Sequence, residues 1–133
     1  MTEQDLSEMT VDTFAATWLQ QCLQNLLSMG RTASVTALSG LLPNVPAVIV
    51  GAGPSLPKNV EHLRDLQGKA VILACSRSLK VLQAAHVVPE FVVVLDAQDL
   101  SAHFEGYIWD PRTILVLGIA SHPAMFALPA RKL

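Results

Sequence analysis

The chain has 133 residues and a net charge of −2 at pH 7, with 51% hydrophobic and only 15% charged residues. This length is enough for one domain with a hydrophobic core and too short for two. Without clustered lysine or arginine, the chain lacks the basic footprint of a nucleic-acid-binding protein. Its apolar runs reach the length of a strand but not that of a bilayer span, so we expect neither nucleic acid nor a membrane as partner.

The N-terminal residues and the cysteines indicate a cellular compartment, and the C-terminal residues indicate a domain boundary. Residues 1–10 are polar and acidic, unlike a signal or transit peptide, and Cys22 and Cys75 lack the spacing of a metal or redox motif. We therefore expect a cytoplasmic protein with reduced thiols. The chain ends soon after its fourth predicted strand, where an α/β domain normally continues, so we expect a truncated domain.

An amphipathic helix is predicted over residues 11–29, with Thr10 as its N-cap and Gly30 as its C-terminal stop. Its predicted apolar face consists of Val11, Phe14, Ala15, Trp18, Leu19, Cys22, Leu26 and Leu27. The opposite, polar face consists of Asp12, Gln20, Gln21, Gln24 and Asn25. Residues 31–42 suit a further short helix, so residues 1–42 are interpreted as an N-terminal helical segment. We interpret Trp18 and Trp109 as packing residues.

Strands and helices alternate over residues 43–133, and a glycine-containing loop follows the first strand, so we interpret this segment as a partial nucleotide-binding domain. Strands are predicted at 47–51, 70–75, 91–95 and 113–117, and helices at 56–66, 78–85 and 100–103. The strands are short and rich in valine and isoleucine, which is typical of a buried parallel sheet. The predicted fold is therefore α/β: a Rossmann-like, doubly wound parallel sheet with flanking helices.

A glycine-containing loop follows the first predicted strand and leads into a helix. It consists of Gly51, Ala52, Gly53, Pro54 and Ser55. A dinucleotide fingerprint would need a third glycine where Leu56 stands, and no Gly-Lys-Ser/Thr follows at the spacing of a phosphate-binding P-loop. Two readings remain open: an anion cradle at a helix N-terminus, or a structural turn with Ser55 as the N-cap.

Polar residues also follow the second and third predicted strands. Ser76 and Arg77 come after the second strand, Asp96 and Asp99 after the third, and His103 shortly beyond. Because the carboxyl ends of parallel strands meet at one edge of a sheet, these side chains are candidates for one crevice.

Each of these residues has a functional and a structural reading. Arg77 is expected either to contact a phosphate or to be solvated. Asp96 suits a ribose hydroxyl, Mg²⁺ or a proton, and we favour a functional role for it. Asp99 is a second candidate metal ligand, although we favour a role as helix cap. His103 is a candidate for proton transfer.

The segments PAVIVGAGPSL, VILACSRSLKVL and VPEFVVVLDAQD together resemble a known bacterial and archaeal family. Its members include the motility accessory factor proteins, which are linked to flagellin glycosylation, and archaeal 6-hydroxymethyl-dihydropterin diphosphokinases. The resemblance runs from about Leu41 to the C-terminus and departs at Glu90, where the family often has aspartate. The helix over residues 11–29 resembles the segment that precedes this domain in the motility proteins.

The glycine loop is also similar to that of bacterial sialyltransferases that use CMP-sugars. This similarity implies that Gly51, Gly53, Pro54 and Ser55 lie at the nucleotide phosphates, that Ser76 lies beside the nucleotide, and that Asp96 faces the crevice. Those enzymes often have asparagine where this chain has Ala52, so one side-chain hydrogen bond would be missing here.

The resemblances imply three alternative functions. The first is the nucleotide-binding domain of a glycosyltransferase that moves a nonulosonic acid from a CMP-sugar to flagellin. The second is a pterin diphosphokinase that uses ATP and Mg²⁺, with Asp96 and Asp99 on the metal. The third is a non-catalytic fragment or interaction domain. We expect no permanently bound cofactor, and we expect a homo-oligomer that associates through an open sheet edge or the N-terminal helix.

Overall fold

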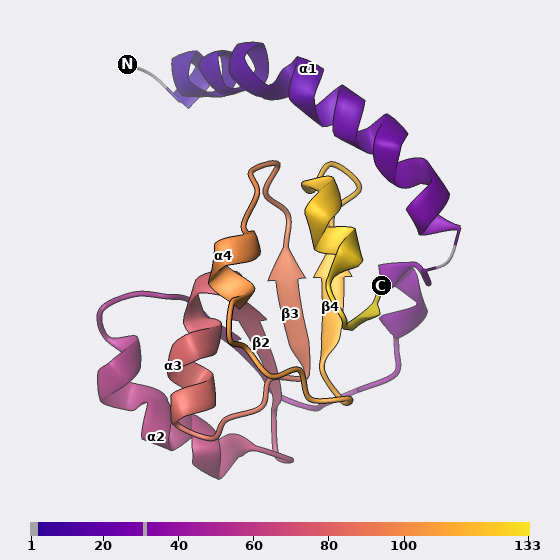
Figure 1. The fold of residues 1–133 in the computed structure, drawn as a ribbon. Helices are drawn as coiled ribbons and strands as arrows, with labels where there is room; N and C mark the ends of the chain where they lie inside the picture. Colours follow the sequence, from indigo (N-terminus) through magenta and orange to yellow (C-terminus); the bar gives the residue numbers. More distant parts are fainter. Residues whose placement is uncertain (1–2, 31) are drawn as a thin grey trace.

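The computed structural model describes residues 3–30 and 32–133. Its centre is a five-stranded parallel sheet in the order β1-β2-β3-β4-β5 (Figure 1). The strands are β1 (Ala47–Val50), β2 (Val71–Cys75), β3 (Phe91–Val94), β4 (Ile114–Leu117) and β5 (Arg131–Lys132). The register pairs Val48 with Ile72 and Val92 with Leu115. The α/β class and the parallel sheet are thus confirmed.

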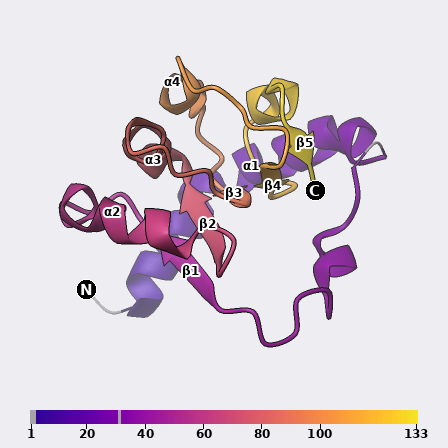
Figure 2. The same ribbon diagram turned by 90° about the horizontal axis from the view of Figure 1, so that it is seen from below.

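The connecting helices all lie on one face of this sheet (Figure 2). They are α2 (Leu56–Leu66), η2 (Ser76–Ser78), α3 (Leu79–Ala84), α4 (Ser101–Phe104) and η3 (Pro123–Ala127). The expectation of a doubly wound sheet is wrong for this reason. Right-handed crossovers that step in one direction across a sheet place every helix on the same side, whereas helices on both faces require the strand order to reverse.

The core lies between the sheet and these helices. Ile72, Leu82, Val92 and Leu115 are fully buried there, in contact with residues of α2, α3 and η3. On the other face of the sheet, Ile49 and Leu95 are 85% and 69% exposed. The strands therefore have two apolar faces, of which the connecting helices cover one.

The predicted elements from residue 47 onward are found within one residue at each end. The short strand β5 was not predicted, because two basic residues carry no hydrophobic pattern. It pairs with Ile114 and Leu115 of β4, and the backbone of Leu133 extends this pairing. A 3₁₀ helix, η1 (Val35–Leu38), lies in the stretch for which a short helix was expected.

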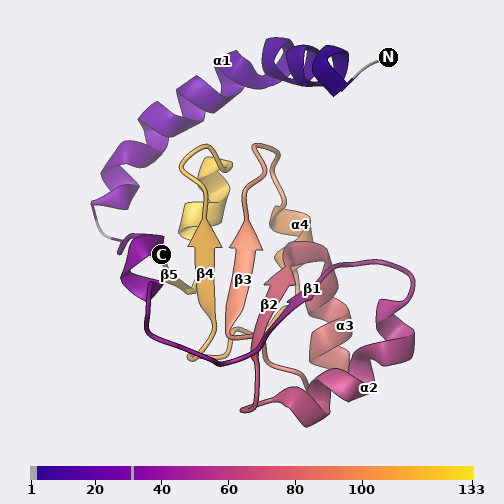
Figure 3. The same cartoon turned by 180° about the vertical axis from the view of Figure 1, so that it is seen from behind.

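The first helix, α1 (Glu3–Met29), passes over the carboxyl ends of the strands (Figures 1 and 3). It begins before Thr10, so the predicted N-cap is wrong, whereas its end just before Gly30 agrees with the prediction. No helix within the described part of the chain combines the length and the apolar character that a bilayer span requires.

The orientation of α1 differs from the predicted one. Gln21 and Asn25, expected on the solvent side, are buried at 6% and 1% exposure. Leu19 and Leu27, expected to face inward, are 64% and 88% exposed. Hydrogen bonding explains this reversal. Carbonyl groups in the loops at the carboxyl ends of the strands need donors, which amide side chains supply and leucine side chains lack.

Candidate functional site

The glycine loop joins β1 to α2 and lies at the carboxyl edge of the sheet, with residues 51–55 all exposed. Ser55 occupies the N-cap position of α2, but its side chain makes no capping hydrogen bond. The turn is closed by its backbone instead, with Leu56 N donating to Gly53 O at 3.0 Å and Lys58 N to Ser55 O at 3.1 Å. The Ser55 hydroxyl is thus left for another partner.

The backbone conformation of this loop does not require glycine at position 51 or 53. A Cβ at Gly51 would meet no atom within 4 Å, and one at Gly53 would meet Ser55 Oγ at 3.9 Å. Neither has the positive φ that favours glycine. What the two glycines provide is an open surface, over which a ligand can approach the main chain closely.

Two predicted site residues come together at the ends of β2 and β3. Ser76, buried in η2, has its Oγ 2.9 Å from His103 Nδ1 in α4. Whichever atom donates, this hydrogen bond orients the imidazole and leaves its Nε2 without a protein partner among the described residues. Arg77 is exposed and forms no ion pair with any residue that the structure describes.

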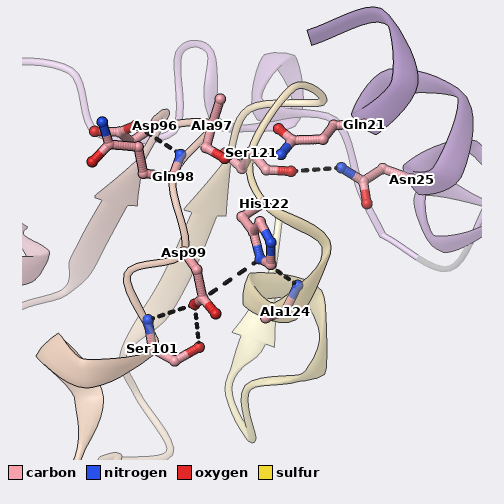
Figure 4. A network of polar contacts seen from close by, with 10 residues as sticks. All are labelled: Gln21, Asn25, Asp96, Ala97, Gln98, Asp99, Ser101, Ser121, His122 and Ala124. Atoms are coloured by element: carbon pink, nitrogen blue, oxygen red, sulfur yellow. Dashed lines mark hydrogen bonds and ion pairs between the residues drawn. The ribbon is translucent and has the colours of Figure 1, made fainter. Parts of the chain in front are cut away.

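Asp96 and Asp99 are each tied into the loop that follows β3 (Figure 4). Asp96 Oδ1 accepts a hydrogen bond from Gln98 N at 2.9 Å. Asp99 Oδ1 accepts from Ser101 N at 2.9 Å and from Ser101 Oγ at 2.5 Å, so Asp99 closes a turn just before α4, whose N-cap residue is Leu100 and not Asp99. These bonds, the one from the Ser101 hydroxyl first, lower the pKa of Asp99 below its usual value.

A histidine from the next loop lies beside Asp99. His122 Nδ1 is 4.0 Å from Asp99 Oδ1 and accepts a hydrogen bond from Ala124 N at 3.3 Å (Figure 4). An Nδ1 that accepts a hydrogen bond carries no proton, so the two side chains form an ion pair only when His122 becomes protonated. Among the described residues, no group of three or more histidine, cysteine, aspartate or glutamate side chains is arranged to hold a metal.

The amide side chains of α1 attach that helix to the same loops, a contact that the sequence analysis missed. Gln21 Nε2 donates to Ala97 O at 2.8 Å, and Asn25 Nδ2 donates to Ile119 O and Ser121 O, each at 2.8 Å. Gln21 Oε1 is buried, and no donor among the described residues reaches it. One signal was present in the sequence: Phe14, Trp18, Gln21 and Asn25 follow the spacing of a single helix face.

A cavity of about 810 Å³ lies between α1 and the carboxyl ends of β1, β2 and β3. Gly51, Asp96 and Gln98 line it together with apolar side chains from both the helix and the strands. The structure thus brings the start of the glycine loop and Asp96 to one cavity and Ser76 to His103. Ser55 and Arg77 make no hydrogen bond to the other candidate residues in the described chain.

The fold and this edge define an α/β protein with its candidate site at the carboxyl ends of parallel strands, where ligands of such proteins bind. The family model described as 6-hydroxymethylpterin diphosphokinase MptE-like matches residues 20–132. The chain belongs to this MptE-like family.

Three relatives illustrate the range of this similarity. An uncharacterized protein of Treponema pallidum is 32% identical over 104 residues, covering 75% of this chain and 46% of that protein. A 6-hydroxymethyl-7,8-dihydropterin pyrophosphokinase of Methanocaldococcus jannaschii is 29% identical over 86 residues, covering 62% of this chain and 36% of that protein. The structure of a Maf glycosyltransferase from Magnetospirillum magneticum superposes with a TM-score of 0.58 at 27% identity, over 65% of this chain and 14% of that one. The chain therefore spans less than half the length of each.

Proposed function

We propose that this chain is the nucleotide-binding part of a glycosyltransferase of the motility accessory factor type. In the proposed reaction, a nonulosonic acid passes from a CMP-sugar donor to a serine or threonine hydroxyl of flagellin. The observation that carries the proposal is the open glycine loop at the carboxyl edge, with an uncommitted Ser55 hydroxyl at the start of α2. The similarity to the Maf glycosyltransferase structure supports it.

The proposed chemistry divides the residues into two groups. The bond from the sugar carbon to the phosphate oxygen breaks, and a bond from that carbon to the acceptor oxygen forms. The main chain at Gly51 and Gly53 and the Ser55 hydroxyl would stabilise the departing CMP phosphate. His103, held by Ser76, or Asp96 would take the proton of the acceptor hydroxyl.

A second candidate function is diphosphate transfer from ATP to a hydroxymethylpterin. The family description and the Methanocaldococcus relative favour it. In this reaction Asp96, together with Asp99, would hold Mg²⁺ on the ATP phosphates. Each carboxylate keeps its Oδ2 without a hydrogen bond among the described residues, and Mg²⁺ commonly takes one or two carboxylates plus phosphate oxygens. The metal would then neutralise charge on the transferred phosphates.

Calorimetric titration separates these functions. The 133-residue protein is titrated with CMP, CDP, ATP and 6-hydroxymethylpterin, each with and without Mg²⁺. Metal-independent binding of cytidine nucleotides is the result expected for the glycosyltransferase. Mg²⁺-dependent binding of ATP together with binding of the pterin would replace it with the diphosphokinase. A folded sample that binds none of them would overturn both and leave a non-catalytic fragment.

Two glycine variants make the test specific for the loop. Gly51→Ala places a methyl group in open space, so it should fold normally and weaken nucleotide binding about tenfold, or ~1.4 kcal/mol. Gly30→Ala is the matched control, because its Cβ would meet only Leu27 O at an ordinary 3.8 Å, far along the chain from the loop. Equal affinities of the two variants would contradict a phosphate site at Gly51.

A further inference from the structure

The cavity beneath α1 has walls of two kinds. The strands contribute the apolar side chains of Ile49, Leu73, Cys75, Val93 and Leu95, which belong to the sheet face that α2 and α3 leave uncovered. The helix α1 contributes Phe14 and Trp18. A volume of about 810 Å³ lies within the ~300–1,000 Å³ that is usual for small-molecule sites.

The aromatic wall is preformed. The rings of Phe14 and Trp18, one helical turn apart, are stacked with centroids 5.9 Å apart and planes inclined by 21°. Both side chains are only partly buried, so ring surface is left toward the cavity. The hydrogen bonds of Gln21 and Asn25 to the loops below hold the next turns of α1 in place. A planar ligand would thus meet an aromatic surface already fixed in position.

Polar groups of the cavity come from the loop that follows β3, where Asp96 and Gln98 line it. Asp96 Oδ1 is bound to Gln98 N, while among the described residues Asp96 Oδ2 accepts no hydrogen bond. Gly51, the first residue of the glycine loop, lines the same cavity. The cavity is thus an apolar slot with one aromatic wall, one carboxylate oxygen and an adjoining loop for phosphate. These features match a planar heteroaromatic ring that carries N–H groups and a charged tail.

We propose that this cavity binds the heteroaromatic ring of the ligand, with Trp18 stacking on the ring and Asp96 accepting from its N–H edge. The inference rests on the proposed function, since it assigns the ring of the same ligand whose phosphate meets residues 51–55. It extends the site to residues before position 20, outside the segment that the family model matches. A cytosine base and a pterin share this ring chemistry, and the ligand panel separates them.

The fluorescence of Trp18 tests the proposal directly. The chain has two tryptophans, and Trp109 packs away from the cavity against Phe104 and Tyr107, so Trp109→Phe makes Trp18 the sole reporter. Titration with CMP, and separately with 6-hydroxymethylpterin, should quench this emission saturably for the ligand that binds. The midpoint should agree with the calorimetric dissociation constant.

Two substitutions at position 18 then separate stacking from packing. Trp18→Leu keeps an apolar side chain but removes the ring, and should weaken binding about 5- to 150-fold, the usual range for loss of one stacked base. Trp18→Phe keeps a ring and should recover most of the affinity. As a second readout, bound ligand should slow modification of Cys75 by a thiol reagent in a Cys22→Ser background, because Cys75 lines the cavity and is partly accessible.

The results of these experiments distinguish failure of this inference from failure of the proposed function. Suppose that Trp18→Leu binds a ligand as well as wild-type protein does, and that this ligand neither quenches Trp18 emission nor protects Cys75. The ring of the ligand then lies elsewhere. This result overturns the inference but leaves the phosphate site standing. If Trp18→Leu weakens binding and Gly51→Ala does not, the ring site stands and the phosphate assignment falls. If folded protein binds no ligand of the panel, both are overturned.

Discussion

At the scale of single residues, the hydrogen bond between Ser76 and His103 is the contact that most restricts the chemistry of the site. Two side chains that follow different strands, 27 positions apart, meet at 2.9 Å. Ser76 is buried, so we expect it to affect a substrate through the imidazole that it orients. We therefore predict that Ser76 is a positioning residue, with His103 as the candidate base.

Removing the Ser76 hydroxyl should change the tautomer balance of His103. In Ser76→Ala, imidazole Nδ1 loses its partner, so the ¹⁵N shifts of His103 should move while those of His62 stay unchanged. Ser76→Thr retains a hydroxyl and should keep the native shifts. In an active full-length protein, the same alanine variant should lower kcat about tenfold and alter its pH profile, with little change in KM. Unaltered His103 shifts in Ser76→Ala would refute the positioning role.

A second residue-scale prediction concerns Asp110 and Arg112. The Arg112 side chain donates from Nε and Nη2 at 2.9 Å, and its backbone N donates at 2.9 Å as well. These bonds, those of the side chain first, lower the pKa of Asp110 from 3.8 to about 2. A carboxyl with a depressed folded-state pKa stabilises the fold fully above its unfolded pKa, and this contribution is lost as the pH falls from about 4 toward 2.

Asp110→Asn should therefore flatten the fall in the free energy of unfolding between pH 4 and pH 2. Urea unfolding at several pH values measures this. Arg112→Met removes the side-chain donors and should flatten the same part of the profile. If either variant keeps the full wild-type slope, the pair does not set the acid sensitivity of the fold.

At the scale of elements, amide side chains attach α1 to the loops at the strand ends more than leucine side chains do. Asn25 is almost fully buried and satisfies two carbonyl groups, one of which belongs to Ser121, whose own hydroxyl donates to Val94 O at 2.9 Å. The helix is thus joined to the end of β3 through a chain of hydrogen bonds. This attachment holds Phe14 and Trp18 over the strands.

Asn25→Leu should loosen the attachment of α1 more than the small change in side-chain size suggests. It leaves two carbonyl groups without their donor, at a cost of about 1–3 kcal/mol in the free energy of unfolding. Trp18 emission should shift to the red as the helix loosens, and thermal unfolding should begin earlier. Gln24→Leu, an exposed amide one position away, is the matched control and should change neither. Equal stability of the two variants would show that these hydrogen bonds do not anchor the helix.

At the scale of the whole molecule, exposed apolar side chains of the described residues gather on the sheet and on α1. One such surface is the sheet face that carries Ile49 and Leu95. The other is the leucine stripe of α1, defined as Leu19, Leu23, Leu26 and Leu27, which are 64%, 61%, 53% and 88% exposed. Their spacing of i, i+4, i+7 and i+8 forms one continuous helix face, opposite the face that meets the sheet. An exposed apolar stripe of this kind marks an interaction surface.

We expect two copies of the chain to associate through the leucine stripe. Light scattering at micromolar concentration should give a mass above that of one chain, and Leu23→Glu with Leu26→Glu should return it to the monomer. Gln20→Glu with Gln24→Glu adds the same charge beside the stripe and should leave association intact. A wild-type monomer at these concentrations would contradict the expectation.

The sequence by itself determined the alternation of the main strands and helices over residues 47–117, with their bounds. Local rules are strong there: each strand is a short apolar run, and each helix repeats its apolar residues at helical spacing, so no distant contact is needed to recognise them. The positions of Gly51, Ser76, Asp96 and His103 at one edge followed from the same alternation.

Tertiary structure decided which faces are buried. The helices cover one face of the sheet because the strand order never reverses, and strand order depends on pairing between distant segments. The burial of Gln21 and Asn25 depends on carbonyl groups about 76 to 96 residues away, which no local pattern reveals. For the same reason β5, two basic residues long, exists only because β4 offers an edge for it to pair with.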